Sequence, residues 1–155
     1  MQNKTDQSWM SIAIELAKQA GESGEVPVGA VLILDDKVIG KGRNQSIELN
    51  DPSAHAEIQA LREAGSKIGN YRLNRSKIYV TIEPCTMCIG ALVHARIEKL
   101  IFGAREPKSG AVSYPNDILE KNSFNHRFKV IEGVLEDECS QLMRNFFRAR
   151  RNNQC

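Results

Sequence analysis

The chain has 155 residues, 41% of them hydrophobic and 26% charged, a composition typical of a globular protein with one domain over residues 1–155. The polar first residues lack the apolar stretch of a secretory signal, and no apolar run approaches the roughly 18 residues of a membrane helix. The net charge of +2 by itself neither indicates nor excludes a nucleic-acid partner. We therefore expect a cytoplasmic protein without a membrane segment.

The beginning of the chain predicts a helix followed by a β-hairpin. Apolar side chains recur at helical spacing over residues 7–20. Residues 28–34 form a continuous apolar run, which is typical of a buried strand. The pair Asp35-Asp36 predicts a turn, and residues 37–42 predict the returning strand.

The middle of the chain predicts two helices with a strand between them. Residues 43–51 are polar and irregular, and Ser53 is then expected to cap a helix over residues 54–64. The run Ile-Tyr-Val-Thr-Ile over 78–82 is the clearest strand in the sequence. Pro84 is expected to begin the next helix, which ends near residue 95, because the missing N–H of proline costs nothing at that position.

The last third of the chain predicts short elements before a long helix. Strands are expected over 100–102 and 128–131, a short helix over 117–121, and the last helix over 136–151. The alternation of segment types predicts an α/β fold, with helices on both faces of a five-stranded sheet. The hairpin makes that sheet mixed, while the order of the strands does not follow from the pattern.

One motif of the sequence indicates a chemistry. His55-Ala56-Glu57 is followed, after 26 intervening residues, by Pro84-Cys85-Thr86-Met87-Cys88. An imidazole and two thiolates suit zinc, and a catalytic zinc keeps its fourth position open for water. Both segments stand at predicted helix starts, where unpaired N–H groups favour thiolate over thiol.

The carboxylate of Glu57 is expected to move protons and not to bind the metal. It would take a proton from the water and deliver protons to a ring nitrogen and to the departing amine. The pattern H-x-E…P-C-x-x-C is the known signature of zinc-dependent nucleobase deaminases. The predicted reaction therefore replaces an exocyclic amine by oxygen.

Other interpretations of the motif are weaker. Cys-x-x-Cys alone can be a redox pair. A closed, purely structural zinc site would need a fourth protein ligand, and none of Cys139, His94 and His126 stands at an obvious spacing. We expect Cys139 to pack within the last helix, and we expect no role for Cys155.

The motif resembles that of the cytidine deaminase superfamily, and further segments are similar to the bacterial tRNA-specific adenosine deaminases. These segments are Glu25–Val31, Asp51–Ile58, Asn70–Leu73, Phe102–Arg105 and Asn125–Arg127. The resemblance extends from about residue 8 to residue 151. It implies a three-layer α/β/α sandwich, one zinc ion per subunit and a homodimer with its active site near the subunit interface. It also implies a substrate, the wobble adenosine of a tRNA anticodon, which is converted to inosine.

The resemblance also implies contacts with the substrate. Asn44 would hydrogen-bond the flipped-out base, the backbone amide of Ala56 would contact it too, and Val28 would line the base pocket. Contacts with the RNA around the target are implied for Lys108, Phe147 and Arg148. The chain departs from the family at Glu106, where an aspartate is common, and the added methylene changes the reach of that carboxylate.

The last helix has an apolar side and a basic side. Apolar residues at helical spacing predict a side that faces the core: Cys139, Leu142, Met143 and Phe146. The opposite side carries Arg144, Arg148 and Arg151. Such a stripe is by default a solvated face, but the resemblance favours a contact with RNA, with Phe147 stacking on a base.

Three functions remain open from the sequence. The first is a tRNA adenosine deaminase. The second is a zinc deaminase of a free base or nucleoside (cytidine, cytosine or guanine), which would share the whole metal site. The third is a non-catalytic RNA-binding or scaffolding subunit, against which the intact Glu57 argues.

Overall fold

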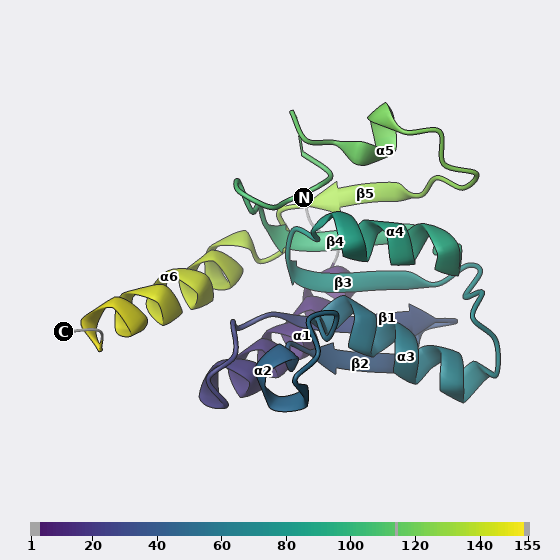
Figure 1. Cartoon of the computed structure of the whole chain (residues 1–155). Coiled ribbons are helices and arrows are strands. Elements are labelled where there is room, and N and C mark those ends of the chain that lie inside the picture. Colours follow the sequence, from purple (N-terminus) through teal and green to yellow (C-terminus); the bar gives the residue numbers. More distant parts are fainter. Residues whose placement is uncertain (1–3, 114, 154–155) are drawn as a thin grey trace.

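A five-stranded sheet lies at the centre of the computed structural model, which describes residues 4–113 and 115–153 (Figure 1). The strands are β1 (Gly29–Leu34), β2 (Lys37–Arg43), β3 (Lys77–Ile82), β4 (Lys99–Ala104) and β5 (Lys129–Glu132). Their order is β2-β1-β3-β4-β5. β1 runs antiparallel to both β2 and β3, whereas β3, β4 and β5 are parallel. The predicted mixed sheet is confirmed, and the structure adds the strand order.

Helices cover both faces of the sheet, as predicted. They are α1 (Lys4–Glu22), α2 (Ser46–Leu49), α3 (Ala56–Ile68), α4 (Thr86–Ala95), α5 (Ile118–Lys121) and α6 (Glu136–Asn152). Figure 1 shows α3 and α4 in front of the sheet and α1 behind it. Most of α6 projects beyond the carboxyl ends of the parallel strands. One apolar core lies under α3 and α4, and a second lies between the sheet, α1 and the start of α6. The layers are those of an α/β/α sandwich.

Two predicted helix starts are wrong by about two residues. Ser53 does not cap α3, because its amide and hydroxyl both donate to Asp51 Oδ1, at 2.8 and 2.7 Å, in a turn before the helix. His55 is the N-cap residue instead. Pro84 also lies outside its helix: its carbonyl accepts from the amide of Ala111, and Cys85 caps α4.

A short helix, α2, occupies part of the segment that the sequence predicts to be irregular. Its first amides are held by the buried carboxylate of Glu25, which accepts from Ile47 N and Glu48 N at 2.8–3.2 Å. These partners lie more than 20 residues apart in the chain. A local pattern therefore could not have predicted this helical turn.

Two glycines of β2 set the position of α3. A Cβ atom on Gly42 would lie 2.1 Å from the carbonyl oxygen of Ala56, and one on Gly40 would lie 2.3 Å from that of Ala60. Only glycine permits this approach of helix and strand. The start of α3, which carries the histidine of the motif, is thereby placed directly against the sheet.

The remaining structural predictions concern membrane segments and cysteines. Among the described residues no helix is long and apolar enough to cross a membrane. Cys139 is buried in α6, as predicted, and burial raises the pKa of its thiol to about 12. Cys155 lies outside the described residues.

Candidate metal centre and active site

The three predicted metal ligands meet where two helices begin. His55 is the N-cap of α3, and Cys85 is the N-cap of α4, which follows β3 directly. Each stands one position before the first helical turn in which the sequence predicts it. Cys88 lies in the first turn of α4 and is buried. The group lies at the carboxyl ends of the parallel strands, the usual place for ligand sites in open α/β sheets.

The geometry of these donors fits zinc. Nδ1 of His55 lies 3.6 Å from both Cys85 Sγ and Cys88 Sγ. All three donor atoms lie within 4.8 Å of one another. A tetrahedral zinc with a Zn–S bond of about 2.3 Å and a Zn–N bond of about 2.0 Å would separate nitrogen from sulfur by about 3.5 Å. The three donors are therefore spaced as zinc requires, with a fourth position for a non-protein ligand.

The electrostatics of the group also favour a thiolate. A hydrogen bond from Cys88 and a second from His55 hold the pKa of Cys85 at about 4. The pKa of Cys88 is raised, mainly by the same hydrogen bond to Cys85 and by burial. The hydrogen bond to Cys85 raises the pKa of His55. Cys85 is thus a thiolate at neutral pH, which is the form of cysteine that binds metals.

Glu57 stands beside the three donors but is not one of them. It lies in the first turn of α3 and is only 3% exposed. Burial raises the pKa of its carboxyl group to about 7, while the nearby imidazole of His55 acts in the opposite direction. A carboxyl group with a pKa near neutrality can both accept and donate a proton under the conditions of the cell.

A small cavity of about 120 Å³ joins Glu57 to two of the three metal donors. Its wall includes four residues that the sequence analysis singles out, namely Val28, Asn44, His55 and Cys85, together with Glu106 and Met143. Asn44 Oδ1 accepts a hydrogen bond from the backbone amide of Ala56 at 2.9 Å. The two groups expected to contact a base are therefore already bound to each other, and the NH₂ group of Asn44 has no partner among the described residues.

Sequence reasoning missed Glu83, a buried carboxylate just before the cysteine motif. It accepts three backbone amides, those of Glu106, Val112 and Ser113, at 2.9–3.1 Å. A Cβ atom on Gly110 would lie 2.3 Å from Glu83 Cδ, so the loop wraps closely around the carboxylate. Glu83 thereby fixes the loop after β4 next to Cys85. The only local signal is an acidic residue at the end of an apolar strand.

The residues with implied RNA contacts lie in a second, larger cleft. It has a volume of about 650 Å³ and runs between α6 and the loop after β4. Lys108, Phe147 and Arg148 all line it, as does the arginine stripe of α6. Glu106 and Met143 line both this α6 cleft and the small cavity, so the two spaces adjoin. The carboxylate of Glu106 accepts from the amide of Lys108 at 2.8 Å and shapes the turn between them.

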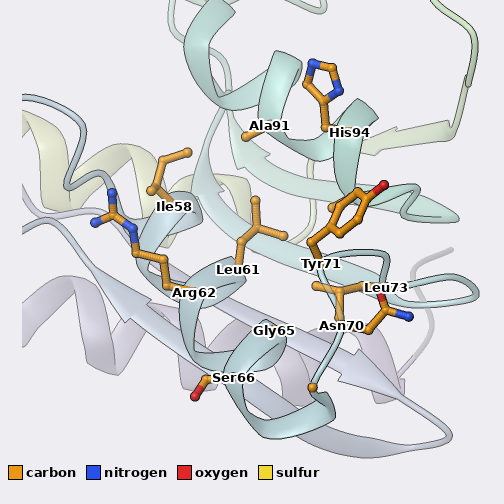
Figure 2. A pocket seen from close by; sticks show the side chains of 12 residues that line it. Ile58, Leu61, Arg62, Gly65, Ser66, Asn70, Tyr71, Leu73, Ala91 and His94 are labelled. Atoms are coloured by element: carbon orange, nitrogen blue, oxygen red, sulfur yellow. The ribbon is translucent and has the colours of Figure 1, made fainter.

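A third cleft, of about 570 Å³, lies between α3 and α4, the two helices that cover one face of the sheet (Figure 2). Leu61 and Tyr71 point into the same space from α3 and from the segment after it, with Ala91 and His94 of α4 above them. Tyr71 is 69% exposed. An apolar cleft with an exposed aromatic residue is typical of a surface that another molecule covers.

Comparison with known proteins identifies relatives over nearly the whole chain. The model of the MafB19-like deaminase family matches residues 4–151. A tRNA-specific adenosine deaminase from Haemophilus influenzae is 47% identical over 155 residues, which cover 99% of this chain and 90% of that protein.

Solved structures share the fold. One, from a study of A-to-I editing by tRNA:A34 deaminases at the wobble position, has a TM-score of 0.85 and 43% identity, and the match covers 87% of this chain and 98% of that one. A guanine deaminase from Nitrosomonas europaea has a TM-score of 0.79 at 23% identity, over 90% of this chain and 83% of that one. At that identity the likeness extends to the fold alone.

Proposed function

This chain belongs to the tRNA-specific adenosine deaminases, within the MafB19-like deaminase family, and we propose from that premise that it converts the wobble adenosine of a tRNA anticodon to inosine. The observation that carries the proposal is the arrangement of the site. Two donors of the metal group, His55 and Cys85, share one small cavity with the buried acid Glu57, and that cavity adjoins a basic cleft. The whole chain would act as one deaminase domain. It would act in the cytoplasm, where its tRNA substrate is found.

Zinc would be held by His55, Cys85 and Cys88. When bound, it would supply an activated water for attack on C6 of the adenine ring. The two helix N-termini favour the thiolate form of cysteine, and the thiolate of Cys85 would in turn bind the cation. No fourth protein donor belongs to the group among the described residues, which argues against a closed structural site.

Glu57 would move the protons of the reaction. Its buried carboxylate would take one proton from the attacking water and pass it to ring N1, and would then take the proton of the hydroxyl added at C6 and pass it to the departing amine. The carbon–nitrogen bond at C6 then breaks, and the products are hypoxanthine, still attached to its ribose, and ammonia. A non-catalytic subunit would have no use for a carboxyl group at this position, since its burial disfavours the charged form and costs free energy.

The cavity walls would read the base. At about 120 Å³ the cavity accommodates one flat base that has left its stack, as deaminases of polynucleotides require. Val28 would contact the ring face, and the free NH₂ group of Asn44 would donate to a ring acceptor. The amide of Ala56 would reach the base only after it exchanges its bond to Asn44 Oδ1.

The α6 cleft would hold the nucleotides on one side of the target. Phe147 is 39% exposed and offers a ring for stacking, while Lys108 and Arg148 provide charges for phosphates. The flanking strand is expected to lie along α6 and to enter the cavity beside Met143, which lines both spaces.

We also infer a homodimer that forms through the α3–α4 face. Met87, Ala91 and His94 lie on one side of α4, and Met87 is 39% exposed next to the metal ligands. With Tyr71 they make an apolar surface that extends from the third cleft toward the active site. A Tyr71→Glu change should shift the protein to a monomer in sedimentation experiments, and an unchanged mass would place the interface elsewhere.

The function is tested with zinc-loaded protein and an anticodon stem-loop RNA that carries a wobble adenosine. Free adenosine, cytidine and guanine are offered separately, and the products are identified by nucleoside analysis. Inosine from the RNA alone supports the proposal. Turnover of a free base or nucleoside, with the RNA untouched, would keep the metal chemistry and replace the substrate.

A Phe147→Ala variant then tests the path of the strand. Loss of one stacked base corresponds to about 1–3 kcal/mol, so KM for the RNA should rise at least severalfold while kcat changes little. Ile68→Ala removes a comparably exposed apolar side chain at the far end of α3 and serves as the control. Equal effects of the two changes would contradict a stacking role.

A further inference from the structure

A second basic cleft lies at the amino ends of the parallel strands, whereas the metal group lies at their carboxyl ends. It has a volume of about 690 Å³, and its lining residues lie before and at the first residues of β3, β4 and β5. Figure 1 shows that these three strands begin at the same end of the sheet. We call this second cleft the far cleft. Since β4 spans six residues at about 3.3 Å each, the far cleft and the active site lie about 20 Å apart. The catalytic site described above therefore does not account for it.

The far cleft concentrates positive charge. Its lining includes five cationic side chains, those of Arg75, Arg96, Lys99, Arg127 and Lys129, and one carboxylate, that of Glu98. With His126 neutral, the five positive and one negative charges leave a net +4, whereas the whole chain carries only +2. The charge of the molecule is thus unevenly distributed, with an excess of cations in this cleft.

Few of these charges are neutralised. The guanidinium of Arg127 donates to the backbone carbonyls of Leu119 and Asn122, which carry no net charge. Arg75 and Asp35 are 3.7 Å apart and both mostly exposed, so their ion pair is weak. The remaining three cations, Arg96, Lys99 and Lys129, form no ion pair within the part of the chain that the structure describes.

In places the fold is opposed by these charges. Lys99 and Lys129 are register partners on adjacent strands, and like charges in such a pair destabilise a sheet. Arg75 and Arg96 adopt φ angles of +67° and +61°. Glycine is favoured over arginine in this left-handed region, and Arg96 even occupies the C-cap of α4, where glycine is the usual residue.

We propose that the far cleft binds the phosphate backbone of a double-helical stem of the tRNA while the anticodon loop occupies the active site. This inference rests on the proposed function. Unneutralised cations spread over three strand starts suit a line of phosphates better than a single anion. Phe128, the aromatic residue of the cleft, is half-buried and tilted against His126 at 6.5 Å, so its ring is a poor stacking surface. Recognition by backbone without base stacking is how A-form RNA helices are bound.

The test uses a variant that carries Arg75→Gly and Arg96→Gly. Because both positions favour glycine, the fold should tolerate the change, and the midpoint of thermal unfolding should not fall. The dissociation constant for full-length tRNA should rise about tenfold, and the slope of its logarithm against log salt should decrease by about 1–2. Binding of a short anticodon loop, and turnover of that loop, should remain as in the parent protein.

A matched variant, Lys37→Gln with Lys41→Gln, removes two exposed charges from β2 outside the clefts described above. It should leave both the affinity and the salt slope unchanged. The proposal is overturned if the arginine variant binds full-length tRNA like the parent protein, or if the lysine variant weakens binding equally. Failure of the proposed function is distinguishable from both, because then the parent protein itself would form no inosine from any RNA.

Discussion

Two buried carboxylates lie beside the metal-ligand segments, and their surroundings give them different tasks. Glu57 is placed in the small cavity, where desolvation raises the pKa of its carboxyl group to about 7. Glu83 lines the same cavity but accepts three backbone amides from the loop after β4. A carboxyl group with a pKa near neutrality can exchange protons, whereas the three accepted amides attach the other carboxylate to the loop. We therefore assign catalysis to Glu57 and positioning of the loop to Glu83.

Replacing Glu57 by glutamine should separate activity from stability. With the proton carrier gone, kcat should fall by about 10²- to 10⁴-fold. Zinc content and RNA affinity should stay within about twofold of the parent values, and the protein should be no less stable, since a buried ionisable group is removed. Glu63→Gln, on the exposed side of the same helix, is the control. A Glu57→Gln protein that retains a tenth of the parent activity would contradict the assignment.

Replacing Glu83 by glutamine should loosen the loop that carries Lys108. The amide NH₂ of glutamine cannot accept from backbone N–H groups, so at least one of the three amides loses its partner. We expect a loss of about 2–3 kcal/mol in the free energy of unfolding, measured with urea. Hydrogen exchange at Val112 and Ser113 should become faster, and KM for RNA should rise.

The same change on an exposed helix provides the comparison for Glu83. Glu120 lies on α5 and is exposed, so Glu120→Gln should change stability by less than about 0.5 kcal/mol. If Glu83→Gln is no more destabilising than Glu120→Gln, the three amides do not depend on Glu83 for their partner.

Among the elements, α3 depends most on its neighbour. Its first turn presses on β2 through Gly42, and this approach fixes where His55 and Glu57 stand relative to the sheet. Gly42→Ala places a methyl group 2.1 Å from the carbonyl oxygen of Ala56, so the helix must shift. We expect a loss of at least about 1–3 kcal/mol in stability together with weaker zinc binding, measured by urea unfolding and by metal titration.

A glycine without such a contact should respond in the opposite direction. Gly21 lies in the last turn of α1, and its nearest atom to an added Cβ is Pro27 Cβ at 3.5 Å, an ordinary contact. Gly21→Ala should be neutral or raise stability by up to about 1 kcal/mol and leave zinc affinity unchanged. A harmless Gly42→Ala would mean that α3 can move without disturbing the site.

For the molecule as a whole, the metal would be a cross-link between distant segments. His55 and Cys85 lie 30 residues apart and begin different helices. A ligand that binds only the folded state raises the free energy of unfolding by about 4 kcal/mol when its free concentration is a thousand times its dissociation constant. Removal of zinc by a chelator should therefore lower the midpoint of thermal unfolding by about 10 °C. Re-addition of zinc should restore it, and a His55→Ala variant should not respond to the chelator.

The sequence by itself determined the parts of this protein that depend on local pattern and on motif. Apolar runs and helical spacing predicted the five strands and the long helices, because burial repeats with the period of the element that is buried. The ligand types and their spacing predicted a zinc group with an acid beside it. Few side chains bind zinc, and a set of three such ligands leaves the fourth position open.

Only the tertiary structure decided the features that join residues far apart in the chain. The helical turn α2 depends on Glu25, and the loop after β4 depends on Glu83, each through amides more than 20 residues away. The start of α3 was predicted two residues too early, because Ser53 is taken up by the turn with Asp51. The strand order, the adjoining cavity and α6 cleft, and the far cleft all arise from packing. A local pattern records what each segment buries, but not which segment it meets.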